Sequence, residues 1–399
     1  MQPPMIALGG GVTLGAVLNC LHKSGIAVYA VTPPGDFVRH SRWYRPLPGE
    51  GVAPQPENLA ETLSTLPIER AVLLPCSDDW LRAVAALPAW LSERFPSSTA
   101  GSGVDLLEDK WRFAQLLDSL SLPHPRTHLI ASNEQLNSLP ESVFSGAILK
   151  PLSSVQFAAR HGVKGYLVGS YAEAQKVLCQ LDLPIMLQEF IPGPPTAGYF
   201  LDGFRDRKGK ICAMFARRRE RMFPAKLGNS TALTSVPVSE LEGAVSDLES
   251  LLEKIRYRGI FSAEFKRDAR DGLFKLIEIN ARPWWYVEFA SRCGVDVCSM
   301  AFRDALGLPN LPVWEYEIGR KCIFAINDLR AWREQSHAQR GAWRSLLRAW
   351  IGSDSTPFHW RDPGPVFYCL RANVIEFLRA KLTPLFHWRV QPAIQRHTH

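Results

Sequence analysis

The chain has 399 residues, 46% of them hydrophobic, which allows a large core divided between two or three domains and excludes an intrinsically disordered protein. Its eight cysteines include no C-x-x-C pair and so indicate neither a zinc site nor a disulfide framework. We therefore expect a reducing, cytoplasmic location. The formal net charge of +7 arises after residue 319, where thirteen Lys and Arg stand against five Asp and Glu. A solvated basic surface is the favoured interpretation of this excess, with nucleic acid or an anionic membrane as the alternative.

The first hundred residues predict strand–helix–strand units of a parallel sheet. An apolar strand over 5–11 runs into a glycine loop, a helix follows to about Ser24, and a second strand covers 26–31. A third strand over 71–75 leads into Ser77-Asp78-Asp79, which can cap a following helix.

The glycine loop of this first unit is weak evidence for dinucleotide binding. Its spacing, Gly9-Gly10-Gly11-x3-Gly15, matches the dinucleotide fingerprint only loosely. The acidic residue that should bind a ribose after the second strand is absent, and Thr32-Pro33-Pro34 stands there instead.

Three lysines in the next stretch stand at the ends of predicted elements. Lys110 opens an amphipathic helix, and Lys150 ends an apolar strand over 147–150. Lys164 lies in a polar loop whose small residues are Ser153, Ser154, Gly162 and Gly165. Small residues let a backbone fold over phosphates, and lysines supply charge. Taken alone, Lys110 is better explained as an ordinary lysine on the surface of a helix. For Lys164, an ordinary solvent-exposed lysine and a phosphate-binding lysine are equally good explanations.

Further strands follow, and one of them ends in a dense basic cluster. An apolar strand over 185–193 stops in a Pro-Gly turn, and two more cover 198–205 and 210–217. The cluster consists of Arg217, Arg218, Arg219 and Arg221. Because side chains alternate along a strand, Arg217, Arg219 and Arg221 should share one face. A basic surface strand is the alternative. An amphipathic helix is predicted over 238–257.

The stretch from Phe261 to Trp285 predicts a β-hairpin with acidic groups on one face. If Glu264 pairs with Glu278, the apolar side chains of Phe261, Ala263, Phe265, Ile277 and Ile279 share one face. Glu264, Lys266, Glu278 and Asn280 then share the other. This register needs an odd number of loop residues, and we expect three, with Gly272 in a left-handed bulge position.

This register sets two carboxylates opposite each other with side-chain roots about 5 Å apart, which is destabilising without a cation between them. Glu264, Glu278 and the Asn280 amide are oxygen ligands that suit Mg²⁺ or Mn²⁺. A solvated polar face, with Lys266 neutralising one glutamate, is the alternative. Arg282, two residues further on, favours the metal interpretation because a guanidinium there can hold phosphoryl or carboxylate oxygens.

The hairpin and the lysines resemble the ATP-grasp superfamily, and the likeness covers roughly the first three-quarters of the chain. It is greatest to the branch of predicted ATP-dependent carboxylate-amine ligases. The resemblance implies an α/β (α+β) ATP-grasp fold in three parts. These are a Rossmann-like pre-grasp domain over 1–104, an ATP-grasp domain over 105–307 with its smaller lobe over about 125–190, and a basic, Trp-rich, mainly helical region over 308–399.

The resemblance also implies roles for single residues. Lys110 would reach nucleotide phosphate, Lys150 would contact phosphate and adenine, and Lys164 is a weaker match. Gln188 to Phe190 correspond to the hinge whose backbone reads the adenine edge, with Glu189 on the ribose. Arg219 is the nearest equivalent of the basic residue at the γ-phosphate, whereas Arg218 or Arg221 could bind a carboxylate substrate. Mg²⁺ or Mn²⁺ would be bound by Glu264, Glu278 and Asn280, and Arg282 would stabilise the transferred group.

The predicted activity is an ATP-dependent ligase that joins a small carboxylate to an amine, both amino-acid-like, through an acyl phosphate. A homodimer is compatible with this prediction, and nucleic acid is not an expected partner. The alternatives are a Rossmann-type oxidoreductase and a non-catalytic nucleotide- or nucleic-acid-binding protein. Near the C-terminus one helix face is predicted to carry Trp343, Leu346, Leu347 and Trp350, with Arg344 and Arg348 beside it. Packing of this face on the protein's own body is favoured over contact with a membrane.

Overall fold

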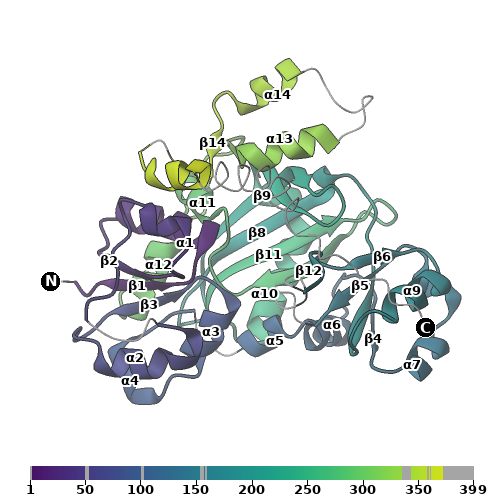
Figure 1. Cartoon of the computed structure of the whole chain (residues 1–399), viewed down its shortest axis with the longest axis horizontal. Helices are drawn as coiled ribbons and strands as arrows, with labels where there is room; N and C mark the ends of the chain where they lie inside the picture. Colours follow the sequence, from purple (N-terminus) through teal and green to yellow (C-terminus); the bar gives the residue numbers. More distant parts are fainter. Residues whose placement is uncertain are drawn as a thin grey trace, which may run out of the picture.

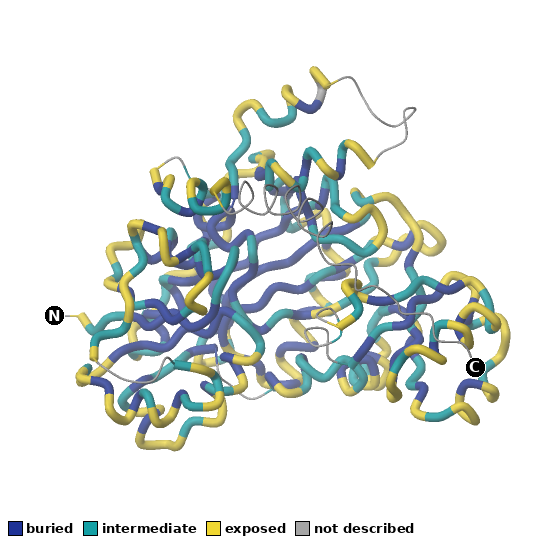
Figure 2. Tube along the Cα trace, in the orientation of Figure 1, coloured by how far each residue is buried: buried dark blue, intermediate teal, exposed yellow. Residues whose placement is uncertain are grey.

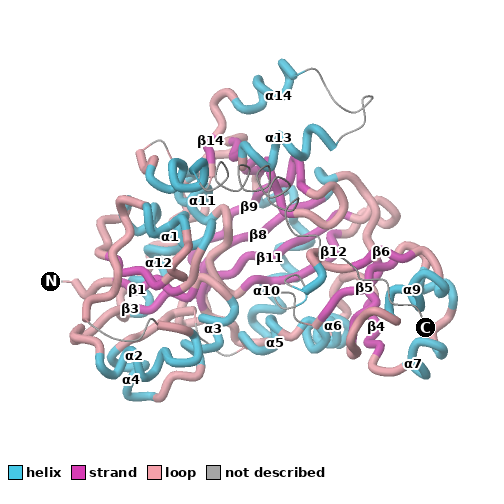
Figure 3. The backbone as a smooth tube through the Cα atoms, viewed as in Figure 1, coloured by secondary structure: helices cyan, strands magenta, loops and turns pink. Residues whose placement is uncertain are grey.

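The computed structural model describes residues 2–49, 54–99, 103–152, 157, 160–334, 343–356, 359 and 361–371. Within these residues the strands form sheets of three, four and seven strands. The seven-stranded sheet lies between the other two (Figure 1, Figure 3). Ser153 and Ser154 of the predicted phosphate loop lie outside the described residues.

The N-terminal unit is a parallel sheet of order β2-β1-β3. Its strands are β1 (Met5–Leu8), β2 (Val28–Val31) and β3 (Val72–Pro75). Its helices are α1 (Gly11–Lys23), α2 (Leu59–Thr65), α3 (Asp78–Ala85) and α4 (Ala89–Arg94). Every residue of β1 and β3 is buried, as expected for strands covered on both faces. Ser77 precedes α3, but its side chain makes no capping hydrogen bond.

The four-stranded sheet is antiparallel with the order β4-β7-β5-β6 and forms a small lobe. Its strands are β4 (Thr127–Ile130), β5 (Ala147–Pro151), β6 (Tyr166–Val168) and β7 (Ile185–Glu189). The helices α7 (Asn133–Ser138) and α9 (Tyr171–Leu178) belong to this lobe. Before it come α5 (Val104–Glu108) and α6 (Lys110–Ser119). The carboxylate of Asp109 caps α6 by accepting from the backbone N–H groups of Trp111 and Arg112, and this cap fixes where Lys110 begins the helix.

The large sheet has the order β12-β11-β8-β9-β10-β13-β14. Its strands are β8 (Gly198–Arg205), β9 (Ile211–Phe223), β10 (Asn229–Val236), β11 (Gly259–Arg267), β12 (Phe274–Asn280), β13 (Lys321–Ile323) and β14 (Asp354–Ser355). The strands at its centre are buried along much of their length (Figure 2). Alternate residues of these strands belong to two different apolar clusters, one on each face.

Helices cover both faces of the large sheet. The face that carries Phe261, Ala263 and Phe265 packs against α10 (Glu242–Lys254). The opposite face packs against α11 (Val287–Cys293) and α12 (Val297–Ala305), which also contact α1. The predicted helix over 238–257 is shorter than expected, because residues Val238–Leu241 form a 3-10 turn and the helix ends at Lys254.

The C-terminal region is less purely helical than predicted. It contains α13 (Ala325–Glu334) and α14 (Trp343–Trp350), but β13 and β14 join the large sheet. The predicted single apolar face of α14 is divided, since Leu346 is buried whereas Trp343 and Leu347 are exposed. None of the described helices has the length and apolar character needed to cross a membrane. The mixed α/β class is confirmed, and the predicted domain boundaries remain predictions.

The burial of α10 generates a prediction about stability. Leu248 of α10 is completely buried among the side chains of the hairpin face. Leu248→Ala should lower the free energy of unfolding by about 2–5 kcal/mol, because a cavity replaces packed methyl groups. Urea unfolding measures the change, and Glu249→Ala, at the exposed neighbouring position, is the matched control. Equal stability of the two variants would contradict this packing.

Candidate active site

The hairpin of β11 and β12 has the predicted pairing at its polar end. Glu264 lies opposite Glu278, Ala263 opposite Ile279, and Ser262 opposite Asn280. Phe261, Ala263 and Phe265 point into the core, so the two glutamates project from the other face. The prediction of this register from side-chain alternation is confirmed.

The route to this register differs from the predicted one. Arg267 pairs with Phe274, and the turn closes with Gly272 donating to the Asp268 carbonyl at 2.8 Å. Gly272 has a φ of +77°, as expected, but the loop is longer than three residues. A register shift after Glu264 restores the pairing of the glutamates. As a result Leu276, at 2% exposure, takes the core position that was predicted for Ile277.

Arg219 compensates one of the paired carboxylates. Its guanidinium donates to Glu264 Oε1 at 2.9 Å and to Ser230 Oγ at 2.9 Å. Burial alone would raise the pKa of Glu264, but the charges of Arg219, Lys164 and Lys150 outweigh burial and lower this pKa. Glu264 therefore stays ionised at neutral pH.

The three predicted lysines converge on the same glutamates from different units. Lys150 of β5 donates to Gln188 Oε1 of β7 at 2.8 Å, and Lys164 donates to Asn229 Oδ1 at 2.5 Å. Burial lowers the pKa of Lys150, although the charge of Glu278 opposes this change. Burial likewise lowers the pKa of Lys110, again against the charge of Glu278. The structure thus brings Lys110, Lys150 and Lys164 into one electrostatic cluster with the hairpin carboxylates.

The predicted metal ligands form a donor set that fits a hard divalent cation. Glu264 and Glu278 face each other across the hairpin, and Asn280 Nδ2 donates to Glu278 Oε1 at 3.4 Å. This contact leaves the amide oxygen of Asn280 available as a third oxygen ligand. Two carboxylates and an amide match the oxygen ligands that Mg²⁺ prefers, and Mg²⁺ usually completes its coordination with water and phosphate oxygens.

Arg282 has a partner that the sequence did not indicate. Its Nε and Nη2 donate to the two carboxylate oxygens of Asp78, at 2.5 and 3.3 Å. Burial would lower the pKa of Arg282, but the charge and hydrogen bonds of Asp78 raise it. Asp78 begins α3, so this ion pair joins the N-terminal unit to the end of the hairpin. Asp78 is 39% exposed and can be reached by a ligand.

The inward-facing arginines of β9 have different partners. Arg217 is bound to Asp202 at 2.6 Å, and both side chains are almost completely buried. Arg221 makes two hydrogen bonds to Asp328, at 2.7 and 2.6 Å. Arg218 points away from these three and contacts Glu220 at 3.1 Å. The shared face of Arg217, Arg219 and Arg221 is confirmed. Arg218 and Arg221, considered for substrate binding, already pair with carboxylates of the chain.

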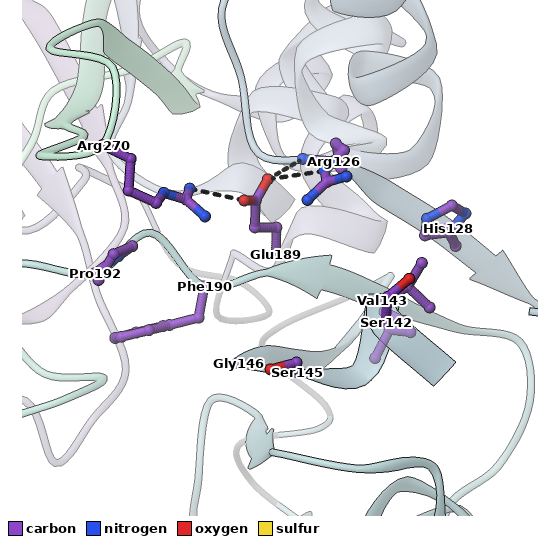
Figure 4. A pocket seen from close by; sticks show the side chains of 11 residues that line it. Arg126, His128, Ser142, Val143, Ser145, Gly146, Glu189, Phe190, Pro192 and Arg270 are labelled. Atoms are coloured by element: carbon purple, nitrogen blue, oxygen red, sulfur yellow. Dashed lines mark hydrogen bonds and ion pairs between the residues drawn. The ribbon is translucent and has the colours of Figure 1, made fainter. Parts of the chain in front are cut away.

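Glu189 does not face the lysine cluster. Gln188 contacts Lys150, so the next side chain along β7 projects from the opposite face. The Glu189 carboxylate is bound by Arg270 at 2.7 Å and by Arg126 at 3.4 Å (Figure 4). These residues line a cavity of about 240 Å³. The expected ribose contact is therefore not supported by the direction of this side chain. The ring of Phe190 lies 4.9 Å from the Lys266 ammonium.

One further cluster was not evident from cysteine spacing. Ligand atoms of Cys20, Asp296 and Cys298 lie within 4.8 Å of one another, where α1 meets α12. Hydrogen bonding to Cys20 and burial raise the pKa of the Cys298 thiol well above its usual value. Because metals bind the thiolate form, this environment opposes metal binding.

The N-terminal end of α1 is occupied by a carboxylate of the chain itself. Gly11 N–H donates to Asp36 Oδ2 at 2.6 Å, and the Thr32 hydroxyl donates to the same oxygen at 2.9 Å. A Cβ atom on Gly10 would lie 2.5 Å from this oxygen, so a larger residue there would push the Asp36 carboxylate away from its hydrogen bonds. Asp36 fills the position where a dinucleotide fold binds the pyrophosphate.

The hairpin loop generates a prediction about pH. Hydrogen bonds from Arg270 lower the pKa of Asp268 to about 2, below the value of about 4 expected in the unfolded chain. The ion pair therefore stabilises the fold fully above about pH 4, and this contribution disappears as the pH falls towards 2. Asp268→Asn should cost about 1 kcal/mol at pH 7, discounted because Arg270 is half exposed.

Urea unfolding of both proteins between pH 7 and pH 2.5 measures this effect. The difference in free energy of unfolding between the wild-type protein and Asp268→Asn should become smaller below about pH 4. Glu93→Gln, at an exposed position on α4, is the control. A difference that is independent of pH would contradict the assigned ion pair.

Known proteins resemble the chain in sequence and in fold, although no protein-family model matches it. D-aspartate ligase of Enterococcus faecium is 24% identical over 252 residues, which are 59% of each chain. The arginine-specific large chain of carbamoyl phosphate synthase from Bacillus subtilis is 24% identical over 216 residues, or 52% of this chain and 20% of the relative. The chain thus spans 59% of the first relative and one fifth of the second.

Solved structures extend the likeness to most of the chain. The biotin carboxylase domain of Hydrogenobacter thermophilus 2-oxoglutarate carboxylase, solved with MgADP and bicarbonate, superposes with a TM-score of 0.63 at 14% identity. It covers 80% of this chain and 74% of its own. N5-carboxyaminoimidazole synthetase from Staphylococcus aureus superposes with a TM-score of 0.61 at 14% identity. This superposition covers 80% of the present chain and 82% of the synthetase. The chain therefore shares the fold of these solved structures, and the resemblance to ATP-grasp proteins that the sequence showed is confirmed.

Proposed function

We propose that the chain is an ATP-dependent ligase that activates a carboxylate as an acyl phosphate and joins it to an amine, releasing ADP and phosphate. The observation that carries this proposal is the convergence of Lys110 and Lys150 on the paired carboxylates Glu264 and Glu278. Lysines and carboxylates gathered in this way complement the phosphates of a nucleotide and a bridging divalent cation.

The charges of the cluster support a polyanionic ligand. Five cationic side chains, Lys110, Lys150, Lys164, Arg219 and Arg282, interact with three carboxylates, Asp78, Glu264 and Glu278. The cluster therefore has more positive than negative side chains. Burial lowers the pKa of both Lys150 and Lys110. Binding of triphosphate would relieve the repulsion between the cations and stabilise the ammonium forms.

The chain's residues would act by position and charge. Glu264, Glu278 and Asn280 would hold Mg²⁺, which neutralises negative charge on the phosphates when bound. The substrate carboxylate oxygen attacks the γ-phosphorus, the bond to the β–γ bridging oxygen breaks, and ADP leaves with those electrons. Arg219 lies beside Glu264, so its guanidinium can stabilise charge on the transferred group. Arg282 can act likewise if it shares its donors between Asp78 and the ligand.

The second step forms the amide bond. The lone pair of the amine attacks the carbonyl carbon of the acyl phosphate, the amine loses a proton, and phosphate leaves with the electrons of the C–O bond. We infer small, amino-acid-like substrates, because one relative, similar over 252 residues, is a D-aspartate ligase. A homodimer and a cytoplasmic location are parts of the same proposal, and the eight free cysteines are compatible with that location.

One observation argues against the oxidoreductase alternative. Asp36 accepts hydrogen bonds from Gly11 and Thr32 at the N-terminal end of α1, where a nicotinamide dinucleotide would place its pyrophosphate. A pyrophosphate at this position would have to displace the Asp36 carboxylate, and the negative charge of Asp36 would repel it. The non-catalytic alternative predicts nucleotide binding without turnover, so measuring turnover separates it from the ligase.

Isotope transfer tests the proposed reaction directly. With a productive pair of amino-acid substrates, ¹⁸O in the carboxylate should appear in the released phosphate, because that oxygen becomes the C–O–P bridge. The nucleotide product should be ADP. Mass spectrometry of phosphate and chromatography of nucleotides give the readout. AMP with pyrophosphate, or phosphate without label, would rule out the acyl phosphate.

The role assigned to Glu278 generates the second functional prediction. Glu278→Gln keeps the shape of the side chain and removes one charge from the metal ligands, so turnover should fall by about 10² or more. ADP formation with the same substrates measures it. Asp271→Asn removes a carboxylate from the exposed loop of the same hairpin and should leave turnover unchanged. Equal effects of both substitutions would contradict the assignment.

A further inference from the structure

Helix α14 is anchored to the rest of the protein by one of its edges. Leu346 is 6% exposed, and the indole N–H of Trp350 donates to Asp328 of α13 at 2.7 Å. Figure 1 shows α14 at the outer end of the molecule, beyond α13. The helix therefore has a fixed attachment, and its other faces are determined by helical geometry.

A stripe of large apolar side chains runs along an outward face of α14. Trp343, Leu347 and Ile351 are 58%, 44% and 78% exposed. They follow each other at intervals of four residues, which places them one above another on a helix. The hydrogen bond from Ile351 N–H to the Leu347 carbonyl, at 2.9 Å, keeps Ile351 in the helical path. Three neighbouring side chains of this size form a continuous uncovered surface.

The stripe has a positively charged border. Arg344 and Arg348 each follow a stripe residue directly, both are exposed, and Arg344 lies 5.7 Å from the ring of Trp343. Among the described residues, neither guanidinium forms an ion pair with a carboxylate. These two arginines belong to a stretch, from Arg320 to the end of the sequence, that has thirteen Lys and Arg against five Asp and Glu.

We propose that α14 docks on an anionic lipid surface, with the apolar stripe below the headgroups and the two arginines at the phosphates. An apolar face with tryptophan at its end and arginines along one side is the pattern of helices that lie in the membrane interface. Charge complementarity favours anionic lipid as the occupant over a second copy of this basic chain. The surface lies outside the lysine and glutamate cluster, so the inference is independent of the proposed ligase activity.

Vesicle sedimentation with the full chain tests the proposal. The protein should pellet with vesicles of phosphatidylglycerol and phosphatidylcholine at low salt, and should stay in solution with phosphatidylcholine alone. Raising the salt concentration should release it, because screening weakens the attraction of the arginines. Three apolar side chains give reversible binding, so the partition coefficient is the quantity to compare.

Substitutions distinguish the two contributions. Leu347→Glu should reduce partitioning into vesicles roughly tenfold or more. The substitution removes a leucine that would be buried in the lipid and adds a negative charge that anionic headgroups repel. Arg344→Ala should reduce it roughly fivefold, and only with anionic vesicles. Leu311→Glu is the matched control, since Leu311 is 81% exposed but lies outside α14. Equal melting temperatures of the variants would show that the fold is retained.

Several outcomes would overturn the proposal. These are failure of the wild-type chain to pellet with anionic vesicles at low salt, equal binding to uncharged vesicles, and an equal loss from Leu311→Glu. Light scattering tests the other occupant. A concentration-dependent dimer that Leu347→Glu abolishes would show that the stripe covers a second copy of the chain.

Discussion

Two carboxylates held opposite each other on neighbouring strands are the constraint on which the site depends. Glu264 and Glu278 repel each other at this spacing, so the fold must supply positive charge from elsewhere. Arg219 comes from β9, Lys150 from the small lobe and Lys110 from the start of α6. Lysines whose pKa is lowered by burial are poorly solvated, so without ligand this cluster costs free energy. A polyanion with a divalent cation would relieve both the repulsion and the poor solvation, and this is the physical argument for the proposed nucleotide site.

Ion pairs between the units place these charges relative to one another. Arg282 ties the end of the hairpin to Asp78 of the N-terminal unit, and Arg270 ties the hairpin loop to Glu189 of the small lobe. Both contacts are partly exposed, so each alone contributes little free energy. Their importance is geometric, because they join the N-terminal unit, the small lobe and the large sheet at the site. A ligand that binds Arg282 must share it with Asp78, which makes this ion pair part of the binding equilibrium.

Local patterns predicted well what depends on local physics. The strand Gly198–Arg205 has the predicted bounds, and alternation alone gave the pairing of Glu264 with Glu278. The bulge beside Ile277 was missed, because a longer loop with one bulge gives the same parity as a short odd loop. The ribose contact of Glu189 was expected from the resemblance alone, and the alternation of Glu189 with Gln188 along β7 does not support it. The pairing of Arg282 with Asp78 joins residues 204 positions apart, and one sequence does not show such contacts.

The three inward-facing arginines of β9 have different partners, and only one of them borders the lysine cluster. Arg217 is matched by buried Asp202, and its guanidinium lies 3.8 Å from the ring of Phe200, so its charge is already satisfied. Arg219, two residues on, shares its donors between Ser230 and Glu264 and borders the lysine cluster. Arg221 is bound to Asp328, which also accepts from the indole of Trp350 in α14. A continuous path of hydrogen bonds therefore joins helix α14 to the strand that carries Arg219. Contiguity of this kind is necessary for coupling but does not by itself establish it, because coupling needs an element with two alternative arrangements that both sites bias.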